Sequence, residues 1–426
     1  MVWCADGLSD RAGPLTGAAW PEKYRELAER LMAVAPHQSP ALVSSTVDID
    51  EVYEMSPARV RALAEGDGKQ GGLGALFLEA VEGCLRREVD SELSWDWPDG
   101  RPWLQEVLGV PDRVQVGGTG PQAAWALGAL GAPSVMALGR RGREQLSVLP
   151  DGVLLCAGGE LVPAHTAVPT ESELASRHEI LEFPRGSLWA GGRLQRPSRI
   201  IVRFAPIALE VDAEFLGMQE GLSGKAGAAL MAGLNGLGAD DWESRDWAVH
   251  LARVWKDNGI ALRHLELGDT SRPAEFRDIV SGLRGLFSSV GLNSSELQRL
   301  WRSSSDVPAG ALELANILDC SCLVVHSDRW SLAAHRGDRV EIVQRLMAGN
   351  LLAAARAGRG VPQRDVRPTD GSEYSSDLPP SGAAANGWWV ECVPTPHRET
   401  PASTIGLGDT FTAGVILATA LSPGAN

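Results

Sequence analysis

Hydrophobic and polar residues along the chain follow two periods, one typical of buried strands and one typical of amphipathic helices. Short apolar, β-branched runs predict strands within 41–55, 133–140, 199–206, 228–234, 260–268 and 321–328. Helical spacing predicts helices at 21–35, 240–259, 272–287 and 294–301, and segment 113–131 combines strand, glycine turn and helix. Strands that alternate with helices indicate an α/β fold with a mostly parallel sheet covered on both faces.

Breaks in this alternation predict a second, smaller domain. Between 150 and 197 short strand-like pieces are interrupted by Gly and Pro, and 57–104 is mostly helical. We therefore expect a large α/β nucleotide-binding core at 1–47, 105–150 and 200–426, and a discontinuous, β-rich lid or substrate domain at 48–104 and 151–199. Segment 359–387 is rich in Pro, Gly, Ser and Asp and is expected to be a long loop.

Composition narrows the class of protein. The 426 residues carry a formal net charge of -15, which argues against a general nucleic-acid-binding surface. The six cysteines show no zinc-type spacing and no framework suited to a disulfide-linked secreted domain. This favours a reducing compartment, and we expect a cytoplasmic protein. We find neither an N-terminal leader pattern nor an apolar run long enough to cross a membrane, and expect no membrane partner.

The stretch TIGLGDTFTAG, residues 404–414, carries the first chemical signal. Gly406 and Gly408 permit a tight turn whose backbone N–H groups, at the start of a buried helix, would bind an anion. Asp409 would repel a phosphate, so it fits better as a base that takes a proton from an attacking hydroxyl. Alone, Gly-x-Gly-Asp is weak evidence, since the same residues occur in ordinary turns.

Further short stretches give this turn a family context. They are HLE at 264–266, NSSE at 293–296, DID at 48–50, VGGTGPQAA at 116–124, HEILEFPRG at 178–186 and RPSRIIV at 196–202. Their order resembles the ADP-dependent sugar kinases, the glucokinases and phosphofructokinases of the ribokinase-like superfamily. The resemblance covers about 41–421 and implies a ribokinase-like fold with a smaller lid. Asp48 and Ser198 depart from the family pattern, which has Asn at both places.

The resemblance implies roles for the carboxylates. Glu266 and Glu296 would hold Mg²⁺ largely through its waters, as this ion prefers. Glu296 could equally form a reciprocal helix cap with Asn293, and the two roles are compatible. His264 is expected to orient its loop. Gly406, Gly408 and Asp409 would form the catalytic turn.

Acceptor binding is expected between the domains. Asp50, with Asp48 beside it, would grip sugar hydroxyls, and Gly117 and Gly118 would allow close approach. Glu88 resembles a sugar-binding glutamate of the glucokinases and favours a glucose-like acceptor.

A group of arginines leaves open whether the acceptor is a sugar or a sugar phosphate. Arg185, Arg196 and Arg199 could bind the phosphate of a sugar phosphate, or pair with glutamates at 179, 182 and 210.

The leading hypothesis is a kinase that transfers the β-phosphate of ADP to a sugar hydroxyl and yields AMP. An ATP-dependent ribokinase-type enzyme for a specialised sugar or cyclitol is the first alternative, and a catalytically silent sugar or nucleotide sensor is the second. The expected partners are a small sugar and a nucleotide, with the chain a monomer or small homo-oligomer.

Overall fold

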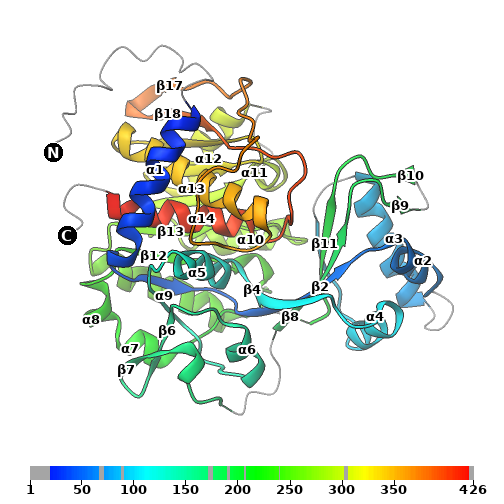
Figure 1. Cartoon of the computed structure of the whole chain (residues 1–426). Coiled ribbons are helices and arrows are strands. Elements are labelled where there is room, and N and C mark those ends of the chain that lie inside the picture. The colour runs from blue at the N-terminus through cyan, green and yellow to red at the C-terminus, as the bar shows by residue number, and fades with distance from the viewer. Residues whose placement is uncertain are drawn as a thin grey trace.

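The chain folds into two lobes of unequal size, each built around its own β-sheet (Figure 1). The computed structural model describes residues 20–66, 72–87, 91–170, 176–189, 192–205, 208–238, 240–301 and 306–421. Within these ranges the large lobe holds an 11-stranded sheet and the small lobe a five-stranded sheet. No helix in these ranges is long and apolar enough to cross a membrane.

The large sheet is mostly parallel, as the alternation of strands and helices predicts. In spatial order its strands are β17 (Gly382–Ala383), β18 (Trp389–Pro394), β16 (Trp330–His335), β15 (Cys322–His326), β14 (Ser289–Asn293), β13 (Leu262–Glu266), β12 (Ala228–Met231), β1 (Ala41–Ser44), β5 (Ser134–Met136), β6 (Val153–Ala157) and β7 (Glu160–Pro163). Strands β15 through β6 are parallel, and the antiparallel strands lie at the two sides.

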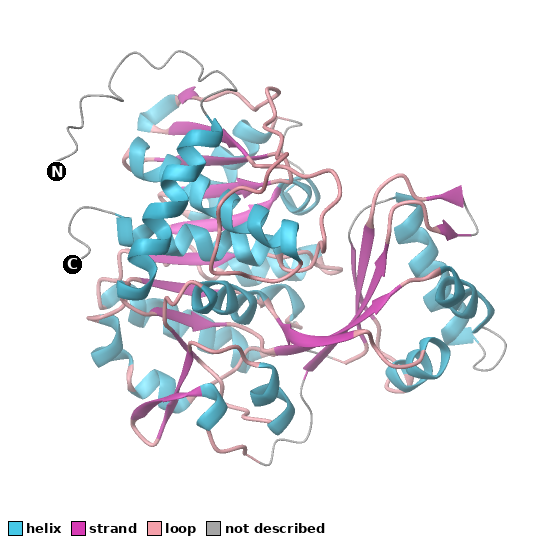
Figure 2. Cartoon of the chain, viewed as in Figure 1, coloured by secondary structure: helices cyan, strands magenta, loops and turns pink. Residues whose placement is uncertain are grey.

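Helices cover both faces of this sheet, so its central strands are buried on both sides (Figure 2). Ala41 and Val43 of β1 pack into one core, and Leu42 between them packs into the other. The first core contains α1 (Trp20–Val34), α5 (Thr119–Ala129), α6 (Arg143–Val148), α13 (Arg339–Arg359) and α14 (Leu407–Leu417). The second contains α7 (Ala213–Gly217), α8 (Gln219–Ser223), α9 (Trp242–Asp257), α10 (Pro273–Ser281), α11 (Ser294–Trp301) and α12 (Val307–Leu318).

The small lobe is a sheet with helices packed on one face. Its strands are, in spatial order, β3 (Ser91–Ser94), β11 (Ser198–Arg203), β8 (Ser176–Phe183), β2 (Asp48–Glu54) and β4 (Arg113–Gly117), with the β9 (Leu188–Trp189) and β10 (Gly192–Arg193) hairpin beside them. The helices are α2 (Pro57–Glu65), α3 (Gly72–Arg87) and α4 (Gly100–Leu108). Phe77 packs edge-on against Trp103 in an aromatic core on this face.

The opposite face of the small sheet meets the large lobe. Val52 and Ile180 on this face pack against Ile405, which precedes α14. Because side chains alternate along a strand, Asp48 and Asp50 of β2 lie on the same face as Val52. The fold therefore carries the predicted sugar-binding carboxylates toward the Gly-x-Gly-Asp turn.

The two sheets divide the chain differently from the expected domain ranges. Strands β6 and β7 lie in 151–199, which we assigned to the small domain, but they extend the large sheet through β5. Strand β4 and most of β11 lie in ranges assigned to the core, yet both pair within the small sheet. The local hydrophobic pattern identifies a strand. Which sheet the strand joins depends on pairing with strands that are distant in sequence.

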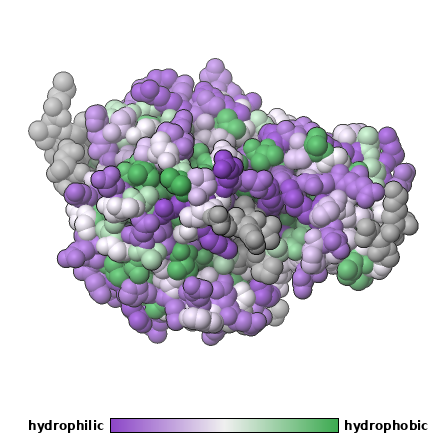
Figure 3. Space-filling view, turned by 90° about the horizontal axis from the view of Figure 1, so that it is seen from below, coloured by the Kyte–Doolittle hydropathy of each residue, from purple (hydrophilic) through white to green (hydrophobic). Residues whose placement is uncertain are grey.

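The expected loop at 359–387 is mostly irregular. Helix α13 ends at Arg359, and the next regular elements are the two-residue strand β17 and a 3₁₀ turn at Ala385–Gly387. The face of the molecule seen in Figure 3 is mainly hydrophilic, with apolar side chains in small separate groups. All five described cysteines are buried and free, and Cys4 lies outside the described residues.

Candidate active site

The Gly-x-Gly-Asp turn forms the N-terminus of helix α14. Gly406 is the N-cap and has φ +68° and ψ 17°, a left-handed conformation that glycine adopts readily. The residues from Thr410 to Leu417 are all buried, which explains why the chain is helical from this point. The first N–H groups of a helix lack partners within it, and the helix dipole adds partial positive charge there. The turn can therefore bind an anion.

Asp409 lies where two helix N-termini meet. Helix α5 begins at Thr119, directly after Gly118 with φ +88°, and the Thr119 side chain hydrogen-bonds to the Asp409 carboxylate. Burial raises the pKa of Asp409 above its ordinary value, although Arg356, Thr119 and Arg199 act in the opposite direction. A carboxylate with a raised pKa is a better proton acceptor than one with the ordinary pKa, as a general base requires.

Asp50 belongs to a row of polar side chains across the small sheet. Its Oδ1 lies 3.0 Å from Nδ1 of His178, and Gln122 Nε2 lies 3.5 Å from its Oδ2. Arg203 Nε donates to His178 Nε2 at 3.0 Å, so the neutral ring carries its proton on Nδ1 and donates it to Asp50. These contacts hold the Asp50 carboxylate in one orientation, as a hydroxyl-binding group needs.

The glycines at 117 and 118 leave room for the two aspartates. A Cβ at position 117 would overlap the Asp50 carboxylate, and one at 118 would come within 2.5 Å of the Thr46 carbonyl oxygen. Asp48 is 0% exposed and accepts a hydrogen bond from Thr46 Oγ1 at 2.7 Å. Asp48 therefore lies against Gly118, whereas Asp50 lies against Gly117.

Glu266 is held by side chains from its own strand β13, from strand β15 and from helix α14. Nε2 of His264 lies 2.9 Å from its Oε2, Nε2 of His326 lies 3.3 Å from its Oε1, and Thr412 Oγ1 donates to Oε2 at 3.0 Å. Burial would raise the pKa of Glu266, but the two histidines lower it to about 2. His264 also lies 2.9 Å from Ser289 Oγ, and therefore orients Glu266.

Glu296 forms the reciprocal cap with Asn293. Its Oε2 accepts from Asn293 N at 2.8 Å, and Asn293 Oδ1 accepts from Glu296 N at 2.9 Å. Burial raises the pKa of Glu296 well above its ordinary value, and the charges of Glu266 and Asp269 add to this effect. Both hydrogen bonds of the expected helix cap are therefore present.

The same carboxylates can also serve a hydrated cation. Within the described ranges no three His, Cys, Asp or Glu side chains are placed to ligate a metal directly. The mutual repulsion of Glu266, Glu296 and Asp269 is what a nearby cation would relieve. Because Mg²⁺ keeps several of its waters, binding through those waters fits this set of carboxylates.

The predicted basic residues have other partners. Arg185 forms an exposed ion pair with Glu399 at 3.1 Å, away from the three glutamates considered as its partners. Arg199 donates from Nη1 to the Thr404 carbonyl, two residues before Gly406. The predicted sugar-binding Glu88 lies outside the described residues.

Several residues that contact the candidate site were not predicted to belong to it. Sequence reasoning did not single out Thr119, Gln122, His178, His326 and Arg356. His178 opens HEILEFPRG, and Thr119 and Gln122 lie in VGGTGPQAA, so these three occurred in stretches that carried the resemblance. His326 lies in the strand predicted within 321–328. Arg356 lies in a largely buried part of α13, outside every motif that was considered.

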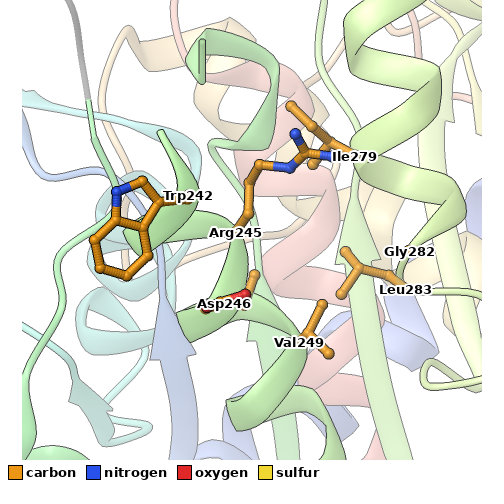
Figure 4. Close-up of a pocket in the computed structure, with 8 residues that line it drawn as sticks. Trp242, Arg245, Asp246, Val249, Ile279, Gly282 and Leu283 are labelled. Carbon is orange, nitrogen blue, oxygen red and sulfur yellow. The ribbon is translucent and has the colours of Figure 1, made fainter. Parts of the chain in front are cut away.

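A separate surface hollow of about 280 Å³ lies between α9 and α10. Trp242, Arg245 and Val249 of α9 line one side, and Ile279 and Leu283 line the other (Figure 4). None of the motif residues lines it, and its wall is mainly apolar. We therefore place the candidate site at the α14 turn and not in this hollow.

Comparison with known proteins shows which family the chain is similar to. Residues 104–328 match the model of the ADP-specific Phosphofructokinase/Glucokinase conserved region. An ADP-specific phosphofructokinase of Pyrococcus abyssi is 25% identical over 363 residues, 74% of this chain and 80% of that protein. A second, from Pyrococcus horikoshii, is 23% identical over 282 residues, 56% of this chain and 59% of that protein.

Solved structures confirm the fold class. An ADP-dependent kinase in complex with fructose-6-phosphate and ADPβS has a TM-score of 0.80 at 17% identity, over 95% of this chain and 98% of that one. The last common ancestor of ADP-dependent phosphofructokinases from Methanosarcinales has a TM-score of 0.71 at 16% identity, over 95% and 99%. The family model matches more than half of the residues, and the chain belongs to the ADP-specific phosphofructokinase/glucokinase family.

Proposed function

We propose that this protein is a kinase that transfers the β-phosphate of ADP to a sugar hydroxyl and releases AMP. The observation that carries the proposal is the position of Asp409. It lies at the anion-binding end of α14, and both Asp409 and the hydroxyl-binding Asp50 act electrostatically on Arg356. A base, an anion site and an acceptor site therefore converge on one buried cation.

In the proposed reaction the acceptor oxygen attacks the β-phosphorus of ADP. The bond from that phosphorus to the oxygen shared with the α-phosphate breaks, and the electron pair leaves with AMP. Asp409 takes the hydroxyl proton, and the N–H groups at the start of α14 stabilise charge on the transferred group. Magnesium, when bound near Glu266 and Glu296, would neutralise charge on the phosphate oxygens.

For the acceptor, a glucose-like sugar remains our first candidate. Arg185 pairs with Glu399 and Arg113 pairs with Glu182, so these two cations already have anionic partners. The second candidate is fructose 6-phosphate, because the curated relatives are named as phosphofructokinases. We also propose that the protein acts in the cytoplasm on these small molecules, without nucleic acid or membrane.

A coupled assay tests the function. Purified protein is given ADP or ATP with magnesium and with glucose, fructose 6-phosphate and other sugars and cyclitols in turn. We expect AMP to form with ADP and one sugar. Turnover with ATP alone would favour the ribokinase-type alternative, and sugar binding without any turnover would favour the sensor.

A further inference from the structure

A buried cation outside the family motifs lies directly against the Gly-x-Gly-Asp turn. Arg356, near the end of α13, is 1% exposed. A Cβ at position 406 would overlap its guanidinium group. Burial of a guanidinium is costly, so its position beside this turn calls for a physical reason.

Arg356 fixes the backbone of the turn. Its Nη1 donates to the Gly406 carbonyl oxygen at 3.1 Å and to Thr410 Oγ1 at 2.9 Å. Thr410 Oγ1 in turn donates to the same carbonyl at 2.7 Å. The carbonyl of the N-cap residue is thereby held from two sides, which fixes the orientation of the N–H groups that follow it.

The remaining donors of Arg356 are available to an anion. Within the described ranges, its Nε and Nη2 are buried and have no hydrogen-bond partner. The ring of Trp125 from α5 lies 5.4 Å from the guanidinium carbon. Buried N–H donors are nearly always satisfied, and charged ones at the start of a helix suit a phosphate group.

The charges around Arg356 come from four elements. Asp409 of α14 and Asp50 of β2 favour its charged form, and Arg199 of β11 and Arg113 of β4 oppose it. Burial lowers the pKa of Arg356 to about 10, which leaves it charged at neutral pH. Around Asp409 the charged groups are Arg356, Arg199 and Glu266, and Arg356 has the strongest influence of the three.

We propose that Arg356 is a positioning residue for phosphoryl transfer, which fixes the Gly406 carbonyl and supplies the positive charge opposite Asp409 and the transferred phosphoryl group. This inference rests on the proposed function. It assigns the residue two separable effects, one on geometry and one on charge. The geometric effect needs the planar guanidinium, whereas the electrostatic effect needs only a cation.

Variants at this position separate the two effects. Arg356→Met removes the charge, and we expect kcat to fall about 100-fold or more, as for loss of an anion-stabilising donor. The acid limb of its kcat–pH profile should move up by roughly one pH unit, because a nearby cation lowers a carboxylate pKa by about that much. Arg356→Lys keeps the charge, so we expect a loss of kcat with little shift of the limb.

Two further variants provide controls. Arg359→Met, one turn along α13, removes an exposed arginine paired with Asp365 and should change neither quantity. Thr410→Val removes the hydroxyl shared by Arg356 and the carbonyl, and should lower kcat without moving the limb. If Arg356→Met does not fold, the kinetics of Arg356→Lys and Thr410→Val test the proposed role of Arg356. Wild-type kcat and pH profile in the folded Arg356 and Thr410 variants would overturn the proposal.

Calorimetric titration with ADP separates this inference from the proposed function. If the wild-type chain turns over no sugar but binds ADP, the kinase proposal fails while the role of Arg356 can still be measured. We then expect Arg356→Met to bind ADP at least about tenfold more weakly than wild type and Arg359→Met. Equal ADP affinities of Arg356→Met and wild type would overturn the proposed role of Arg356. A wild-type chain that neither binds nor turns over ADP would overturn it as well.

Discussion

The carboxylate of Asp409 has a role at the residue scale that one substitution can isolate. Asp409→Asn keeps the size of the side chain but removes the proton acceptor. We expect kcat to fall by about 10² to 10⁴, the usual effect of losing a general base. Affinities for nucleotide and sugar, measured by calorimetry on the same protein, should stay close to wild type.

The pH dependence of the wild-type enzyme follows from the same group. Burial raises the pKa of Asp409, and only the deprotonated form can accept a proton. Activity is therefore full above that raised pKa and is lost as the pH falls through it. The acid limb of kcat should lie above 3.8, the ordinary value of an aspartate. Asp409→Asn should lack this limb, and near-normal turnover in it would contradict the assignment.

Gly117 offers a second test at this scale. A Cβ at position 117 would overlap the Asp50 carboxylate, so Gly117→Ala should displace that group and raise the sugar KM. Gly217→Ala in α7 is the matched control, because a Cβ there meets nothing within 4 Å. Steady-state kinetics of both variants make the comparison. Equal KM values would mean that Asp50 does not hold the sugar.

Sequence allowed prediction of site residues where a short motif contains the chemistry. Glu266 ends strand β13, Asp409 lies in the first turn of α14, and Asp50 lies within strand β2. Arg356 could not be predicted, because the role that we propose depends on a contact with Gly406, 50 positions away. Contacts between distant side chains leave no local periodicity.

At the scale of elements, the start of α11 combines a helix cap with a cluster of negative charge. Glu296→Gln keeps the hydrogen bond to Asn293 N but removes the charge, so the helix should remain stable. If the cluster holds hydrated Mg²⁺, the magnesium concentration for half-maximal rate should rise. Magnesium titrations at saturating ADP and sugar measure this.

Glu296→Ala serves as the control for the cap. It removes both functions, and we expect a loss of about 1 kcal/mol of stability in addition to the altered magnesium dependence. Thermal unfolding of the two variants separates the effects. A magnesium requirement that is unchanged in Glu296→Gln would leave Glu296 as a helix cap alone.

Elements with a clear period were predictable, and their sheet membership was not. The strands now seen as β12, β13 and β15 lie in apolar runs between helices, which is the pattern of a parallel sheet. Strand β14, with the sequence SVGLN, was not predicted. Strands β6 and β7 are short, and Gly and Pro flank them, so they resemble an insertion. They extend the large sheet only because β5 offers a free edge for pairing.

At the scale of the whole molecule, one segment of the large lobe contacts the small sheet. Ser403 donates to Glu182 at 3.3 Å, Arg199 donates to the Thr404 carbonyl, and Ile405 packs against Val52 and Ile180. This segment leads directly into the Gly-x-Gly-Asp turn. We therefore expect any movement of the small lobe to be transmitted to this turn.

This coupling predicts that ligands compact the molecule. A sugar bound to Asp50 of the small sheet and a nucleotide bound at α14 of the large lobe should draw the lobes together and exclude water that would hydrolyse ADP. Small-angle scattering of Asp409→Asn, which prevents turnover, should give a smaller radius of gyration with both ligands than with either alone. Ile405→Ser weakens the apolar contact between the lobes and should reduce that change. Superimposable profiles with and without both ligands would show that the lobes keep one arrangement throughout, and that the site excludes water without closure.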